Sequence, residues 1–145
     1  MKKMIDTFAD YNRFNNITNF SMIIIKYLLD NNENIWKLLK YNTSDALSQP
    51  NLTDDEKTSL IYDGSGIGDD CLKKEESFRV FTKGIFTDTI ETQCSQLHIF
   101  LDELIPENRI IRQANINIQI ISHSNIITLN NYQNRNEVIL QEILS

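Results

Sequence analysis

Residues 63–70 resemble a ligand-binding loop more than any other part of the chain, because they combine three of the four glycines with three aspartates. A phosphate loop needs the spacing G-x-G-x-x-G directly after a buried strand, and neither condition is met. A calcium loop beginning at Asp63 would place Ile67 and Lys74 where oxygen ligands are required. We therefore interpret residues 63–77, which contain this segment, as a flexible surface loop and candidate interface. Its glycines are Gly64, Gly66 and Gly68.

The imidazole and thiol side chains, which can ligate metals or act as nucleophiles, are His98, His123, Cys71 and Cys94. Imidazole and thiolate bind zinc well, but their usual close pairs, such as C-x-x-C or H-x-x-x-H, are missing. No G-x-S-x-G motif marks a nucleophilic serine. We expect no metal, no cofactor and no covalent catalysis. Two cysteines alone leave their pairing open.

Paired carboxylates are the remaining catalytic candidates, since glycosidases and many nucleases use them. Asp69–Asp70 and Asp102–Glu103 are adjacent in the sequence, and neighbours on a strand point to opposite faces. The sequence therefore predicts a protein that is not an enzyme. The enzymatic alternative requires the fold to bring His98, His123, Asp102 and Glu103 together.

The bulk composition favours one globular domain over residues 1–145, because 41% of the residues are apolar. The net charge of -6 repels phosphate backbones, so we expect no specific nucleic-acid binding. The longest apolar run, residues 22–29, contains Lys26 and is too short to span a membrane. Charged residues interrupt the N-terminus where a secretion signal would be apolar. We expect a soluble protein that does not bind membranes.

The first 62 residues are expected to be mainly helical. Apolar side chains recur every three or four residues over residues 5–41, and this pattern is broken at Asn15–Asn16 and Asn31–Asn32. Asparagine favours caps and turns, so the breaks predict three helical pieces. Trp36 lies within the third piece, where its spacing favours core packing over a partner interface.

Two further helices are predicted from capping signals. Thr53 and Glu56 form the pattern of a capping box, which predicts a helix from Asp54 to about Tyr62. Asn134 can cap a C-terminal helix over residues 134–144, whose apolar residues have helical spacing.

The segment between these helices, residues 78–129, is expected to form antiparallel strands. Alternating apolar residues in residues 93–122 flank a turn at residues 106–109 and predict one long hairpin. The inward residues of its two arms are Leu97, Ile99, Leu101, Ala114, Ile116, Ile118 and Ile120. The order of helices, antiparallel strands and a final helix predicts an α+β fold in which the C-terminal helix packs on the sheet.

The outward face of the second arm carries amides, which favours either a solvated sheet face or a subunit interface. Its candidate interface residues are Arg112, Asn115, Asn117 and Gln119. Residues 113–122 contain no charge and no proline, the two features that commonly protect an exposed strand edge. An edge formed by this strand would therefore need a partner or a cover.

The C-terminal half resembles the small neck and tail-completion proteins of tailed bacteriophages over residues 78–145. The segments that carry this resemblance are residues 97–101 (Leu-His-Ile-Phe-Leu), 106–109 (Pro-Glu-Asn-Arg), 116–123 (Ile-Asn-Ile-Gln-Ile-Ile-Ser-His) and 134–139 (Asn-Arg-Asn-Glu-Val-Ile). Residues 34–41 add a weaker likeness.

The resemblance implies a virion protein made in the host cytoplasm. It would form a homo-oligomeric ring, a hexamer or a dodecamer, that completes the tail and joins it to the head. Its partners would be other neck, tail-tube or portal proteins, and a head-completion stopper or adaptor of the connector is the related alternative. From another class, a protein-binding adaptor module predicts a monomer or dimer instead of a ring.

Overall fold

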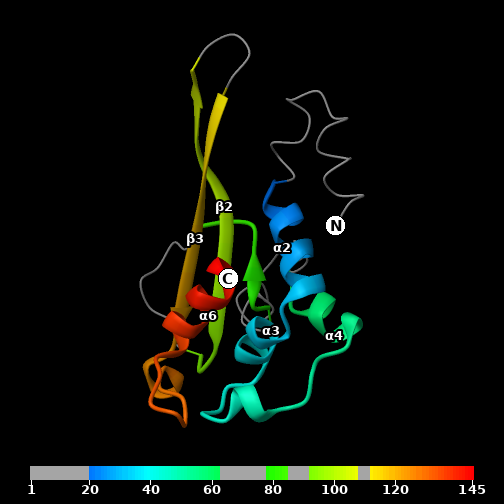
Figure 1. Cartoon of the computed structure of the whole chain (residues 1–145), viewed down its shortest axis with the longest axis vertical. Coiled ribbons are helices and arrows are strands. Elements are labelled where there is room, and N and C mark those ends of the chain that lie inside the picture. Colours follow the sequence, from blue (N-terminus) through cyan, green and yellow to red (C-terminus); the bar gives the residue numbers. More distant parts are fainter. Residues whose placement is uncertain (1–19, 63–77, 85–91, 108–111) are drawn as a thin grey trace, which may run out of the picture.

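A computed structural model describes residues 20–62, 78–84, 92–107 and 112–145. A three-stranded sheet has one face covered by helices α2, α3 and α6, while the short α4 lies to the side (Figure 1). The helices are α2 (Phe20–Asn31), α3 (Glu33–Lys40), α4 (Asp54–Ser59) and α6 (Arg135–Leu144). The strands are β1 (Val80–Phe81), β2 (Ser95–Pro106) and β3 (Arg112–Ser122), and short 3-10 turns are η2 (Ala46–Ser48) and η3 (Ser124–Ile126).

The α+β class and the long hairpin predicted from the sequence are confirmed. β2 and β3 pair antiparallel from Ser95–Ser122 at the base to Pro106–Arg112 near the tip, with one register shift between Leu101 and Glu103. The predicted inward residues share the face under the helices. Leu97 and Ile99 are fully buried there, and Ile116 and Ile120 pack against the core, whereas Ile118 is 36% exposed.

The expectation of a purely antiparallel sheet is wrong for β1, which pairs parallel with β2 through Val80–Leu97 and Phe81–His98. The thirteen residues between Phe81 and Ser95 are enough for the crossover that a parallel pair requires. Residues 85–91 of the predicted strand region lie outside the described residues, as does the loop of residues 63–77.

The predicted break at Asn31–Asn32 is confirmed, because α2 ends at Asn31 and Asn32 caps α3. The Asn32 side chain accepts a hydrogen bond from the Ile35 amide at 3.2 Å. Trp36 belongs to the core, as its spacing indicated: it is 1% exposed, and its indole donates to the Leu28 carbonyl at 3.1 Å. The helical piece expected before residue 16 lies outside the described residues.

The capping box of α4 is confirmed, since Thr53 and Glu56 bond reciprocally. The helix ends earlier than predicted, at Ser59. The following residues instead pair with β1: the Tyr62 amide donates to the Val80 carbonyl at 2.8 Å, and the Val80 amide donates to Leu60. Sheet pairing therefore replaces the last turn of the expected helix.

A buried arginine joins α6 to the rest of the molecule. Arg135 is fully buried, and its guanidinium donates to four backbone carbonyls: Ile126 (2.9 Å), Leu38 (2.6 Å), Tyr41 (2.9 Å) and Thr43 (2.6 Å). The last carbonyls of α3 have no helical partners and carry negative partial charge, so the cation satisfies and stabilises that helix end. Burial lowers the pKa of Arg135, but an arginine stays charged.

Replacing Arg135 with methionine should lower the free energy of unfolding by about 3 kcal/mol or more, because two buried and two partly buried carbonyls lose their donor. Arg135→Lys should recover only part of this, since an ammonium has three donors and no planar fork. Chemical denaturation followed by circular dichroism measures both. The matched control is Lys26→Met, which removes an exposed cation. If Arg135→Met were as stable as this control, the carbonyl contacts of Arg135 would not stabilise the fold.

The hydrogen bonds that Glu56 accepts from the Thr53 backbone and hydroxyl lower the pKa of its carboxyl. At pH values above the ordinary pKa of a carboxyl group, the cap therefore contributes its full stabilisation to α4. This stabilisation is lost as the pH falls through the lowered pKa of Glu56. An NMR titration should show the pKa of Glu56 rising toward its ordinary value in Thr53→Ala. Thr58→Ala, which removes a hydroxyl bonded to the Asp54 carbonyl, should leave it unchanged.

Candidate functional site

The hairpin extends well past helices α2, α3, α4 and α6 at its distal end, so the described part of the molecule consists of a compact body with a long projecting arm (Figure 1). Near the tip of this arm, Glu103, Ile105, Pro106 and Gln113 are exposed. Within the described ranges, no third strand or helix lies against this distal part, and a two-stranded ribbon by itself is only marginally stable in water. This part of the hairpin is therefore suited to contact another molecule.

Among the predicted interface residues of β3, Arg112 and Asn115 lie on this arm, whereas Gln119 pairs with His98 in the three-stranded part of the sheet. Asn115 accepts from Gln113 at 3.3 Å and donates to Glu103 across the strand pair at 3.4 Å. Asn117 and Gln119 are half-buried on the same face. Arg112 is the first residue of β3 and pairs with Pro106. Gly64, Gly66 and Gly68 lie outside the described residues, so their grouping with the strand stays a prediction.

The candidate catalytic side chains occupy separate environments. The ring nitrogens of His98 contact the Lys83 carbonyl at 2.9 Å and the Gln96 side chain at 3.2 Å, and the ring stacks on Phe81 at 4.6 Å. His123 instead caps η3 by accepting from the Asn125 amide. Across the described ranges, no three His, Cys, Asp or Glu side chains gather to hold a metal ion. Cys94 is buried, and Cys71 lies outside those ranges.

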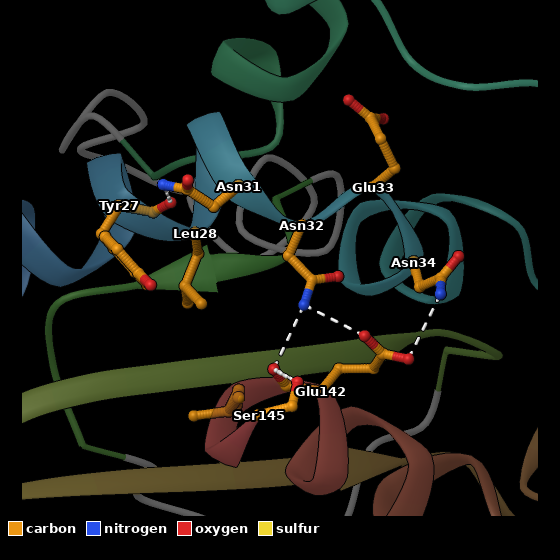
Figure 2. A pocket seen from close by; sticks show the side chains of 9 residues that line it. Tyr27, Leu28, Asn31, Asn32, Glu33, Asn34, Glu142 and Ser145 are labelled. Atoms are coloured by element: carbon orange, nitrogen blue, oxygen red, sulfur yellow. Dashed lines mark hydrogen bonds between the residues drawn. The ribbon is translucent and has the colours of Figure 1, made fainter. Parts of the chain in front are cut away.

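A pocket of about 470 Å³ lies where the α2–α3 junction meets the C-terminal end of α6 (Figure 2). Its walls combine apolar side chains with a row of amides and carboxylates. The lining residues are Tyr27, Leu28, Asn31, Asn32, Glu33, Asn34, Glu142, Ile143 and Ser145. The sequence predicted a helix break at Asn31–Asn32. No sequence pattern connects these asparagines with Glu142, which is more than a hundred residues away.

The carboxylate of Glu142 is held in this pocket by two amides. Asn32 donates to one oxygen at 3.1 Å and also to the Glu142 carbonyl at 3.1 Å, while Asn34 donates to the other oxygen at 3.2 Å (Figure 2). The neighbouring Glu33 forms an ion pair with Lys57. Glu142 is therefore a fixed acceptor whose oxygens retain free lone pairs.

A second exposed feature is the turn that precedes α6. Tyr132 has φ of 67°, a left-handed conformation that is rare for residues other than glycine, and its side chain is 93% exposed. Its amide donates to the Leu129 carbonyl at 3.0 Å, and the Leu129 amide donates to Gln133 at 2.9 Å. The turn therefore presents an aromatic side chain from a well-braced backbone. The adjacent asparagines at 130 and 131 indicate a turn in the sequence but not this exposure.

Comparison with known proteins identifies one family. The model of the YomW family, whose name is a phage-derived gene name, matches residues 32–145. The matched region contains α3, α4, α6, the three described strands and the turn of Tyr132, whereas Tyr27, Leu28 and Asn31 of the pocket precede it. No curated protein and no solved structure matches the chain. None of the helices within the described ranges has the length and apolar character needed to cross a membrane.

The Asn32–Glu142 contact can be tested by exchanging its donor and acceptor. Asn32→Asp keeps the acceptor that caps α3 but sets two carboxylates against each other, so it should destabilise the protein by about 1–2 kcal/mol. Adding Glu142→Gln supplies an amide donor in the reverse direction and should restore part of this loss, because the bond from Asn32 to the Glu142 carbonyl stays lost. Thermal unfolding of the two single variants and the double variant measures the coupling. Additive effects would show that the contact contributes nothing.

Proposed function

We propose a structural role in a tailed-phage particle, from the premise that the chain belongs to the YomW family of phage-associated proteins. In this proposal the protein forms a homo-oligomeric ring at the neck, where it completes the tail and joins it to the head. A head-completion stopper or adaptor of the connector is the closest variant of the same role. The role is structural and involves no catalysis.

The observation that carries this proposal is the projecting β2–β3 arm. Twelve residues of β2 span about 40 Å. The fully buried residues of the strand are confined to its first part, from Ser95 to Ile99. The distal part adds little to the protein's own core, and its exposed Ile105 and amides offer both apolar and hydrogen-bonding contacts. Such an arm suits the joining of successive components of a particle.

The charge of the protein is compatible with this position. A net charge of -6 opposes retention of DNA, and a neck component must let the genome pass without binding it. The neutral run from Gln113 to Ser122 places the contact surface on the least charged part of the chain, which avoids repulsion between copies or neighbours.

Inactivation of the gene in its native phage should leave heads and tails that fail to join, or tails of irregular length, with loss of infectivity. Electron microscopy of the lysate distinguishes these outcomes, and wild-type protein supplied in trans should restore joined particles. Normal numbers of joined, infectious particles without the protein would contradict the proposal.

The arm itself is tested by Asn115→Lys combined with Asn117→Lys in the same complementation assay. Lysines on an edge strand oppose pairing, and the ammonium introduced by Asn115→Lys would face Glu103 across the strand pair, which should keep the hairpin folded. Complementation should fall at least about tenfold. Asn51→Lys, at an exposed residue before α4, is the matched control. If the double variant complemented as well as Asn51→Lys, the arm would not be part of the interface.

A further inference from the structure

The two edges of the sheet are unsuited to closing a ring by strand pairing. A ring requires two different surfaces that fit each other, whereas identical surfaces meet around a two-fold axis and stop at a dimer. β3 forms one long edge, but β1 at the other edge has only two residues. The outer side of β1 is already bonded to Leu60 and Tyr62. Antiparallel pairing of β3 with β3 would therefore produce a two-fold dimer.

We propose that the ring closes by insertion of Tyr132 from one copy into the pocket of the next copy, between the α2–α3 junction and Glu142. This inference rests on the proposed function, in which the protein forms a homo-oligomeric ring, and it specifies the contact between neighbouring subunits of that ring. The occupant of the pocket is thus a second copy of this chain.

The turn that carries Tyr132 is built to present this side chain. Left-handed backbone at a tyrosine is unfavourable by about 1 kcal/mol. The turn is braced by the Asn131 side chain, which accepts from the Gln133 amide at 3.2 Å and donates to its side chain at 2.7 Å. The Asn130 amide also donates to the Ser44 carbonyl at 2.9 Å. A rigid exposed tyrosine loses little conformational entropy when it binds.

The pocket offers what a tyrosine side chain needs. Its volume of about 470 Å³ falls in the usual range for binding pockets. Tyr27 and Ile143 provide aromatic and apolar contacts for the ring, whereas Leu28 is only 4% exposed, and the fixed Glu142 carboxylate can accept from the phenolic hydroxyl.

The surface beside the pocket is also apolar. Leu140 and Leu144 on the outer side of α6 are 46% and 76% exposed, and they line a shallow hollow that shares Ser145 with the pocket. A neighbouring copy seated over Tyr27 and Glu142 would cover these leucines as well. Their exposure in the single chain therefore fits a surface that is covered on assembly.

Charge also favours the second copy as the occupant. The chain is acidic, and Glu142 gives the pocket a carboxylate that would repel an acidic insert. Residues 130–133 are Asn-Asn-Tyr-Gln and carry no charge. The turn is therefore among the segments that two acidic copies can bring together without repulsion.

The positions of turn and pocket exclude insertion within one chain. Tyr132 precedes the N-terminal end of α6, and the pocket lies at the C-terminal end of that helix. The ten residues of α6 span about 15 Å, and Arg135 anchors the start of the helix. The exposed Tyr132 side chain, which we call the knob, and the pocket therefore lie on different parts of the surface of each copy. A contact between the knob of one copy and the pocket of the next is heterologous, as a ring requires.

The direct test replaces Tyr132 with the photo-crosslinker p-benzoylphenylalanine in the full chain. Irradiation should link two copies, and mass spectrometry should map the links to residues 27–34 or 142–145. The same crosslinker at Asn51 is the control and should give no links to these residues. Links from position 132 that map elsewhere, or none between copies, would overturn the insertion.

A mixing experiment tests the heterologous geometry. Tyr132→Ala removes the knob, and Asn31→Trp fills the pocket at an exposed lining residue. Each folded variant alone should remain a single chain at concentrations where the wild type assembles. An equal mixture should give dimers that hold one intact contact and do not close. Tyr132→Phe should still assemble, about tenfold more weakly, because it lacks the hydroxyl.

The outcomes separate this inference from the proposed function. A wild-type ring that Tyr132→Ala leaves unchanged would contradict the insertion alone. Failure of wild-type protein to restore joined particles would contradict the neck role, whatever the subunit contact.

Discussion

The guanidinium of Arg135 is the interaction on which the arrangement of the helices depends. It binds carbonyls of α3, of the turn after α3 and of η3, segments that are far apart in the sequence. Within the described part of the chain no carboxylate pairs with Arg135, and such a buried cation is tolerable only because several oriented carbonyls surround it. Because all its bonds go to backbone atoms, the arginine fixes the path of the chain as well as the packing of side chains.

Both exposed features of the body follow from this anchor. α6 begins at Arg135, so its placement against α3 and the sheet determines where Glu142 meets Asn32 and Asn34. The turn of Tyr132 is joined to the same region through Asn130 and Ser44. The pocket and the exposed tyrosine are thus two ends of one rigid unit. A heterologous contact needs such rigidity, since the angle between its two surfaces decides whether a ring closes.

Local patterns in the sequence predicted the local structure well. The alternation in β2 and β3 predicted the hairpin because one face is buried, and Asn31–Asn32 predicted the break between helices through its competition for backbone hydrogen bonds. The parallel pairing of β1 was missed because a two-residue strand has no periodicity. The early end of α4 was missed because sheet pairing overrides helix propensity.

The nonlocal features were beyond the reach of the sequence. Arg135 occupies the first turn of a helix, a position that disfavours a cation, and this was the one local sign that it serves another segment. The contact of Asn32 with Glu142 joins residues 110 positions apart, and no spacing rule connects them. The amides of β3 were visible as a pattern, but their half-burial depends on neighbours that only the fold brings close.

The central claim is that this member of the YomW family assembles into a closed ring. The most direct measurement is the mass of the purified protein by light scattering after size exclusion, across a wide range of concentrations. We expect one closed species of about six or twelve copies, with a mass that stops rising once the ring is complete. A single chain or a two-fold dimer at every concentration would contradict it.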